Sequence, residues 1–222
     1  FKEFRKSLDK LKKQGATQIA LDLRDNPGGY LSEAINIADE FLEDDKLILY
    51  TKNKSGAIEE TYARRKGAFE NSPVYVIINE NSASASEVVA GALQDNDVGT
   101  IVGRRSYGKG LVQREMELGD GSAVRLTIAR YYTPTGRSIQ KPYDNGNESY
   151  FKDYVHRYEN GEFKSIDSID VDDSLRYETP EGKVVYGGGG IIPDVFVGRD
   201  TNAEMENIIL MHKKRYDEPF YF

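Results

Sequence analysis

The segment VYVIINENSASASEVVAGALQD, residues 74–95, contains a strand, a polar turn and the start of a helix in one run. Residues 74–79 are mostly apolar and rich in β-branched side chains, which predicts a buried strand. From about Ser84 to Gln94 the apolar residues gather on one side of a helix, so a helix is predicted to begin directly after the turn. A strand that leads into a helix in this way is typical of proteins with a parallel sheet.

Similar units lie on both sides of this segment. Residues 17–23 (TQIALDL) predict another buried strand, the turn DNPGGY follows it, and residues 31–41 have the spacing of an amphipathic helix. Residues 100–103 (TIVG) predict a further strand. This alternation predicts an α/β fold in which a mostly parallel sheet is flanked by helices.

Further strands are predicted to be antiparallel. LILYTKN and IEETYAR form one predicted pair, and LVQREMEL and AVRLTIARYY form another across a GDG turn. Residues 144–188 are polar and tyrosine-rich without a clear period, and we interpret most of them as a surface excursion. GGGGIIPDVFV then predicts a returning strand, and a last amphipathic helix is predicted around Ala203 to His212. We expect one domain over residues 1–222.

Composition excludes several chemistries. The net charge is −7, which disfavours nucleic acid as a partner because a phosphate backbone requires a basic surface. The chain has no cysteine, and its two histidines, His156 and His212, have no second histidine at ligand spacing, so we expect no metal site. No apolar run reaches the length of a membrane span, and no signal peptide opens the sequence.

Ser84 is the first candidate for catalysis. A serine that follows a strand and opens a helix projects its hydroxyl from a fixed turn, beside backbone N–H groups that can bind a developing oxyanion. The structural alternative is equally simple, because Ser84 and Glu87 form the capping-box pattern S-x-x-E. Ser82 and Ser86 are rival nucleophiles by composition.

Lys109 is the candidate base, since histidine is so scarce. A lysine acts as a base near pH 7 only with a neutral amine, which requires a pKa roughly three units below the ordinary value of about 10.4. Burial and a hydrogen bond to the amide of Gln113 could favour that state. Two alternatives stay open: Lys109 is an exposed turn lysine, or GRRSYGK at 103–109 is the start of a phosphate-binding P-loop, although that motif then requires Ser or Thr where Gly110 stands.

The NPGG turn supplies a candidate anion site. Gly28 and Gly29 allow backbone N–H groups to approach a ligand closely, and with Ala85 they could bind a tetrahedral oxyanion. A tight strand-to-helix turn explains the same residues.

Taken together, five motifs in this order resemble peptidase family S41, the C-terminal processing (tail-specific) proteases. They are LDLRDNPGG (21–29), NENSASASEVVAGALQD (79–95), GRRSYGKGLVQ (103–113), RYYTPTGRSIQ (130–140) and GGIIPDV (189–195). The resemblance implies a ClpP/crotonase-like spiral of β-β-α units and a serine endopeptidase that cleaves proteins or peptides near their C-termini without metal or cofactor. A catalytically silent peptide-binding module on the same scaffold is the alternative.

The resemblance also assigns roles. It implies Ser84 as nucleophile, Lys109 as base and Gln113 as the residue that orients the lysine, with an oxyanion hole from the N–H of Gly28 or Gly29 together with Ala85. Asp95, on the nucleophile's helix, is a secondary candidate. Family members usually carry a PDZ domain upstream of the core and work outside the cytoplasm. We therefore expect that domain to precede this segment in the full-length protein, and a periplasmic or cell-envelope location.

Overall fold

The computed structural model describes residues 1–143 and 146–200, and its elements follow the predicted order. The helices are α1 (Lys2–Lys13), α2 (Leu31–Ala38), α3 (Ala85–Asp95) and α4 (Gly146–Glu159), with the short 3-10 helices η1 (Ile166–Ser168) and η2 (Asp173–Leu175). The strands are β1 (Ile19–Asp22), β2 (Leu47–Asn53), β3 (Ile58–Tyr62), β4 (Val74–Ile78), β5 (Gly99–Gly103), β6 (Leu111–Glu117), β7 (Ala123–Tyr132), β8 (Arg176–Glu178), β9 (Val184–Tyr186) and β10 (Val195–Phe196).

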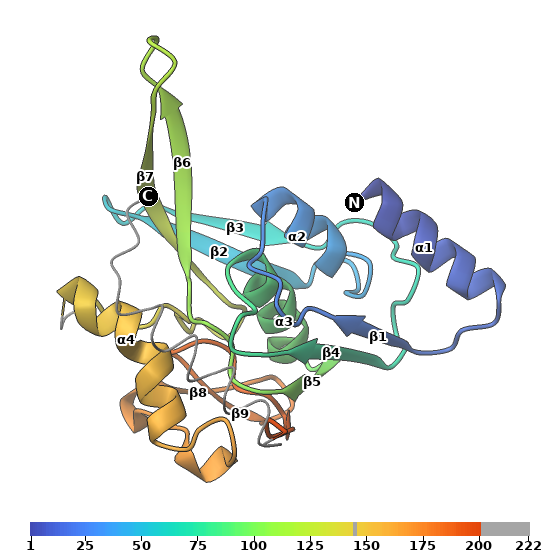
Figure 1. The fold of residues 1–222 in the computed structure, drawn as a ribbon. Coiled ribbons are helices and arrows are strands. Elements are labelled where there is room, and N and C mark those ends of the chain that lie inside the picture. The colour runs from blue at the N-terminus through green and yellow to red at the C-terminus, as the bar shows by residue number, and fades with distance from the viewer. Residues whose placement is uncertain (144–145, 201–222) are drawn as a thin grey trace.

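The first sheet is parallel and has the order β1-β4-β5-β10. Its strands are short and apolar, as expected for a sheet that is covered by other elements. The turns that follow β1, β4 and β5 all leave the same edge of this sheet, because parallel strands share a direction (Figure 1). Ligands of α/β proteins gather at this carboxyl edge. The predicted parallel sheet flanked by helices, with added antiparallel strands, is confirmed.

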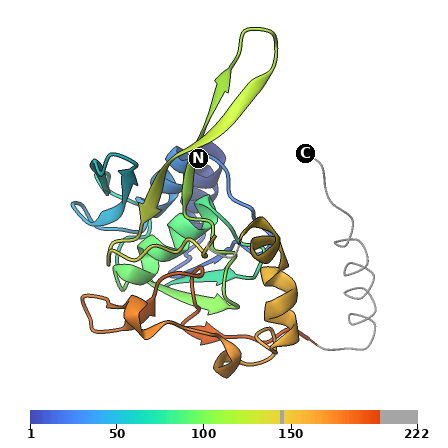
Figure 2. The ribbon, with the colours of Figure 1, turned by 90° about the vertical axis from the view of Figure 1, so that its left-hand side faces the viewer.

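The second sheet is antiparallel, in the order β3-β2-β7-β6. Its β6–β7 hairpin extends well beyond the rest of the molecule (Figures 1 and 2). A bulge between Val112 and Gln113 shifts the register of this hairpin just where it leaves the body. A third, two-stranded sheet pairs β8 with β9.

Helix α3 forms the centre of the core. It contacts β5 of the parallel sheet and β2 of the antiparallel sheet, and all of its residues are buried. This double burial explains its small side chains: a Cβ at Gly91 would lie 2.7 Å from the Cγ2 atom of Thr133. Side chains such as Leu93 are fully buried, which stabilises each by about 1.5–3 kcal/mol. The start of α3 is therefore rigidly positioned.

The segment after residue 143, predicted as a polar surface excursion, contains regular elements. It forms α4, η1, η2 and the β8–β9 pair, and it buries Tyr150, Phe163 and Val185. These apolar side chains are too widely spaced in the sequence to produce a period. The predicted returning strand is shortened to the two residues of β10, and the helix predicted around Ala203 to His212 lies outside the described residues. No helix in the described part of the chain has the length and apolar character of a membrane span.

Candidate active site

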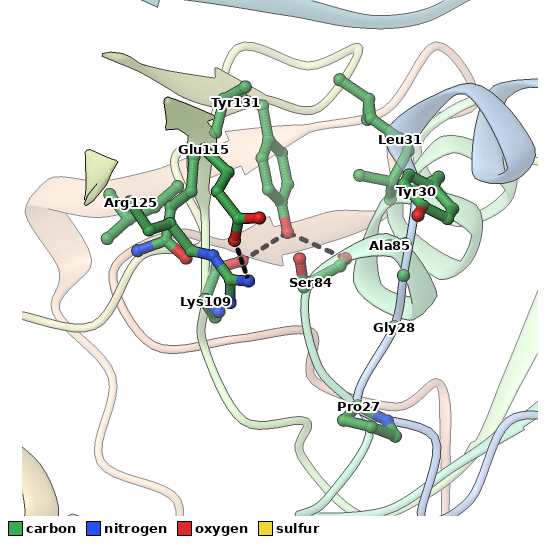
Figure 3. A pocket seen from close by; sticks show the side chains of 15 residues that line it. Pro27, Gly28, Tyr30, Leu31, Ser84, Ala85, Lys109, Glu115, Arg125 and Tyr131 are labelled. Carbon is green, nitrogen blue, oxygen red and sulfur yellow. Dashed lines mark hydrogen bonds and ion pairs between the residues drawn. The ribbon is translucent and has the colours of Figure 1, made fainter. Parts of the chain in front are cut away.

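A pocket of about 550 Å³ opens at the carboxyl edge of the parallel sheet (Figure 3). Its walls come from the turn after β1, the start of α3, the loop between β5 and β6, and the base of the β6–β7 hairpin. Six of the residues singled out from the sequence line it together: Gly28, Gly29, Ser84, Ala85, Lys109 and Gln113. These residues are up to 85 positions apart (113 − 28 = 85) in the sequence, so the fold brings them together.

Ser84 stands at the turn between β4 and α3. Its backbone has φ 55° and ψ −115°, a region that residues with a Cβ rarely adopt. The Ser84 N–H donates to Oε2 of Glu87 at 2.8 Å, which holds this conformation in place. A strained turn of this kind, followed directly by a helix, presents a serine side chain at the mouth of a pocket.

The two rival serines have other partners. The Ser82 hydroxyl donates to the carbonyl of Leu23 at 2.7 Å, and the Ser86 hydroxyl donates to the carbonyl of Asn26 at 3.0 Å. Both side chains are buried, whereas Ser84 is only half-buried and lines the pocket. The geometry thus separates one candidate nucleophile from two serines that fasten the turn after β1.

The turn after β1 is tied closely to the turn after β4. Oδ1 of Asp25 accepts hydrogen bonds from the side-chain amides of Asn79 and Asn81, at 2.9 and 2.8 Å. These bonds lower the pKa of the Asp25 carboxyl. The carbonyl of Asn26 also accepts the N–H of Ala83 at 3.0 Å. The NPGG backbone therefore has a fixed position beside Ser84.

Gly28 and Gly29 differ in their freedom to bind an anion. The Gly28 N–H already donates to Oδ1 of Asn26 at 2.9 Å. In the described part of the chain, the N–H groups of Gly29 and Ala85 have no hydrogen-bond partner. Gly28 is needed for space instead: it has φ 92°, and a Cβ there would lie 2.6 Å from the carbonyl of Ala83 and the N–H of Ala85.

Lys109 lies in the loop between β5 and β6, and the geometry of this loop differs from that of a P-loop. The N–H groups of Gly108 and Lys109 donate to the carboxylate of Glu87, at 2.7 and 2.8 Å. The loop then continues into strand β6, whereas a P-loop opens a helix. The backbone donors that would cradle phosphate are thus occupied by an acidic group.

Two site residues were not recognised in the sequence. The sequence pattern predicts only a helix cap at Glu87, yet its buried carboxylate accepts hydrogen bonds from Ser84, Ser106, Gly108 and Lys109. Burial raises the pKa of this carboxyl. The sequence pattern predicts only a strand position for Tyr131.

The Tyr131 hydroxyl lies between the two candidate catalytic residues. It is 2.7 Å from the carbonyl oxygen of Lys109 and 3.0 Å from that of Ser84, so one buried O–H is shared between both backbones. Figure 3 shows Ser84 and Lys109 on either side of this hydroxyl. Glu87 and Tyr131 together fix the turn of Ser84 relative to the loop that carries Lys109.

Other candidates are placed differently. Gln113 lines the pocket on the exposed face of β6, and within the described residues no hydrogen bond joins it to Lys109. Asp95 is at the far end of α3, outside the pocket, where it forms a fully buried ion pair with Arg137. His156 is exposed on α4, and His212 lies outside the described residues. No cluster of potential metal ligands occurs in residues 1–143 and 146–200.

Comparisons with known proteins indicate the family of this chain. The sequence model of peptidase family S41 matches residues 1–146. A carboxyl-terminal-processing protease of Picosynechococcus is 46% identical over 139 residues, which cover 63% of this chain and 33% of that protein. The chloroplastic carboxyl-terminal-processing peptidase 1 of Arabidopsis thaliana is 40% identical over 133 residues, 60% of this chain and 27% of the relative.

A solved structure is also similar. The photosystem II D1 C-terminal processing protease superimposes on 90% of this chain and 40% of its own, with a TM-score of 0.61 and 28% identity. The chain spans about a third of the length of the curated relatives that it matches. The family match covers well over half of the 222 residues and includes every residue of the pocket. The chain therefore belongs to peptidase family S41.

Proposed function

We propose that this chain is the catalytic core of a serine endopeptidase in which Ser84 is the nucleophile and Lys109 the general base. One observation carries the proposal. Of the three serines in its motif, Ser84 alone has a hydroxyl that is not committed to a backbone carbonyl, and it shares a pocket with Lys109. The unpaired N–H groups of Gly29 and Ala85 border the same pocket.

The proposed reaction has two stages. In the first, the neutral Lys109 amine takes the Ser84 proton while Oγ attacks the peptide carbonyl, and the N–H groups of Gly29 and Ala85 stabilise the oxyanion. The C–N bond then breaks and the protonated lysine gives its proton to the leaving amine. In the second stage, water hydrolyses the ester. Gln113 would orient the amine by accepting a hydrogen bond from it.

The lining of the pocket supports a substrate class. Leu31, Val88 and Val112 contribute apolar surface beside the two catalytic candidates, which suits an apolar substrate side chain. The relatives are named for carboxyl-terminal processing, and we infer cleavage of proteins or peptides near their C-termini. An upstream PDZ domain and a location outside the cytoplasm remain predictions.

The test compares wild type with Ser84→Ala and Lys109→Ala in the digestion of an unfolded protein such as casein. Ser122→Ala and Lys52→Ala are matched controls, because both side chains are exposed and outside the pocket. The site variants should lose roughly 10³-fold or more in kcat/KM, while the controls keep wild-type activity. Equal cleavage by all five proteins would refute the assignment.

A second readout does not depend on substrate capture. A fluorophosphonate should label Ser84 of the wild-type protein, because the reagent requires only an activated hydroxyl and an oxyanion site. The Ser84→Ala variant should stay unlabelled, and Lys109→Ala should react far more slowly. Peptide binding without labelling or cleavage would instead support a silent binding module.

A further inference from the structure

The loop that carries Lys109 has no regular secondary structure of its own. Residues 104–110 run between β5 and β6, and many of their backbone groups have hydrogen-bond partners in distant parts of the chain. Glu87 and Tyr131 bind the loop on the side of the pocket. The opposite side is bound by residues from α4 and beyond, which follow the part of the chain that the family model matches.

Arg157 is the main contact on that opposite side. Its guanidinium donates through Nη2 to the carbonyl of Arg105 at 2.6 Å and through Nη1 to the carbonyl of Ser106 at 3.0 Å. Its Nε donates to Oε1 of Glu162 at 2.8 Å. The side chain is 3% exposed, so all three bonds form away from water. A planar fork of donors suits two successive carbonyls in a way that a lysine cannot reproduce.

Glu162 extends this contact to the loop itself. Its two carboxylate oxygens accept from Nε and Nη2 of Arg105, at 2.8 and 2.5 Å, in addition to the bond from Arg157. Its side chain is 2% exposed. One buried carboxylate therefore joins an arginine of the loop to an arginine of α4, and breaking the set would leave a charge unpaired in the interior.

The same face of α4 makes a second contact with the loop. Tyr150 and Arg157 are seven residues apart, which places them on one side of the helix, and they are its two buried side chains among those that the structure describes. The Tyr150 ring packs edge-on against Tyr107. The ammonium of Lys141 lies 4.0 Å from the centre of the Tyr107 ring and 4.2 Å from that of Tyr150.

We propose that α4 is a clamp for the Lys109 loop, with Arg157 as its positioning residue, so that the segment beyond residue 146 sets the catalytic geometry. The inference rests on the proposed function insofar as Lys109 is the base. Ser106, whose carbonyl Arg157 binds, is three residues before Lys109, and its hydroxyl donates to Oε1 of Glu87. A shift of the clamped carbonyls thus moves the lysine and its support from Glu87 together.

The decisive variant is Arg157→Lys, compared with Arg137→Lys. Arg137 is a matched control because it is also a buried arginine that donates to a backbone carbonyl and a carboxylate, but it lies at the far end of α3. Both variants should be less stable. Below their melting temperatures, only Arg157→Lys should lose about tenfold or more in kcat, with little change in KM, because misplacement of a catalytic group affects the chemical step.

Two further readouts separate positioning from stability. In Arg157→Lys the pH profile of kcat/KM should shift, because the surroundings of the base change, whereas Arg137→Lys should keep the wild-type profile. Amide hydrogen exchange should accelerate at Gly108 and Lys109 in the first variant only. If Arg157→Lys does not fold, Tyr150→Leu removes the second contact of the clamp and takes its place.

The outcomes are distinct. Unchanged exchange of the loop amides would overturn the clamp whether or not the protein is a protease, because exchange needs no activity. If exchange is faster in Arg157→Lys but kcat and the pH profile stay as in the wild type, Arg157 holds the loop but does not position Lys109 for catalysis. That result would overturn the proposed positioning role. Retained cleavage in Ser84→Ala or Lys109→Ala would instead refute the proposed function, which is a separate result.

Discussion

Replacement of Glu87 by glutamine is the sharpest test of how the site is held together. Oε1 of Glu87 accepts from Ser106 and Gly108, and Oε2 accepts from Ser84 and Lys109. The amide group of glutamine places an NH2 on one of the two sides. The NH2 group is best tolerated on the side of Ser106, because the Ser106 hydroxyl can rotate and accept a hydrogen bond from it. The Gly108 N–H on that side then faces a donor instead of an acceptor.

The expected loss of stability follows from the one N–H group that loses its acceptor. One buried N–H without a partner costs about 1–3 kcal/mol, and for a chain of this size the melting temperature should fall by roughly 2–12 °C. The turn of Ser84 and the loop of Lys109 both bond to this carboxylate, so the kcat of the proposed reaction should fall by roughly 10–100-fold. Calorimetry and the casein assay measure the two effects. A melting temperature within about 1 °C of wild type, with unchanged kcat, would refute the reasoning.

The same variant tests the protonation of Glu87. Burial raises the pKa of this carboxyl above its ordinary value of 4.5, so the folded protein holds the proton to a higher pH than the unfolded chain. The stability that Glu87 contributes is therefore fully present below about pH 4.5 and is lost as the pH rises through the folded-state pKa. Glu87→Gln lacks this pH dependence. Urea unfolding of both proteins at a series of pH values from about 4.5 upward should therefore show that the difference between their free energies of unfolding becomes smaller as the pH rises.

Three shorter predictions concern other parts of the site. Gly28→Ala should abolish fluorophosphonate labelling, because its Cβ would lie 2.6 Å from the N–H of Ala85, and full labelling would contradict this. Tyr131→Phe should cost about 1–2 kcal/mol and lower kcat, since two carbonyls lose a shared O–H; calorimetry and kinetics check it, and a neutral effect would show that water replaces the hydroxyl. Asp95→Ala should cost roughly 3–5 kcal/mol in urea unfolding, because Arg137 is left buried without its carboxylate, yet labelling of the folded protein should persist; selective loss of labelling would restore Asp95 as a catalytic candidate.

The sequence was sufficient to predict those parts of the fold whose structure depends on residues that are close together in the chain. The β4–turn–α3 unit and the two glycines after β1 could be predicted, because strand periodicity, helix spacing and turn chemistry are local properties. The parallel order of the strands followed from their alternation with helices. That was sufficient to place Ser84 and the NPGG turn at one edge of one sheet.

What could not be predicted depends on partners that are distant in the sequence. Glu87 fits a local capping pattern, and nothing near it indicates that its carboxylate also binds the loop 22 residues later. Arg137, the partner of Asp95, is 42 residues away in the sequence, so the structural role of Asp95 could not be predicted either. The regular structure of α4 was not predicted, because its two buried side chains, among those that the structure describes, are tyrosine and arginine, which a pattern of apolar residues does not count.

The wide separation of the contacts around Ser106 has a consequence for biosynthesis. This residue is bound from residue 87 on one side and from residues 157 and 191 on the other. A ribosome delivers Ser84 and Lys109 before residues 157 and 191 emerge. We therefore expect a partly synthesised chain to lack a fixed Lys109 loop, and the proposed cleavage to begin only after residue 191 has emerged.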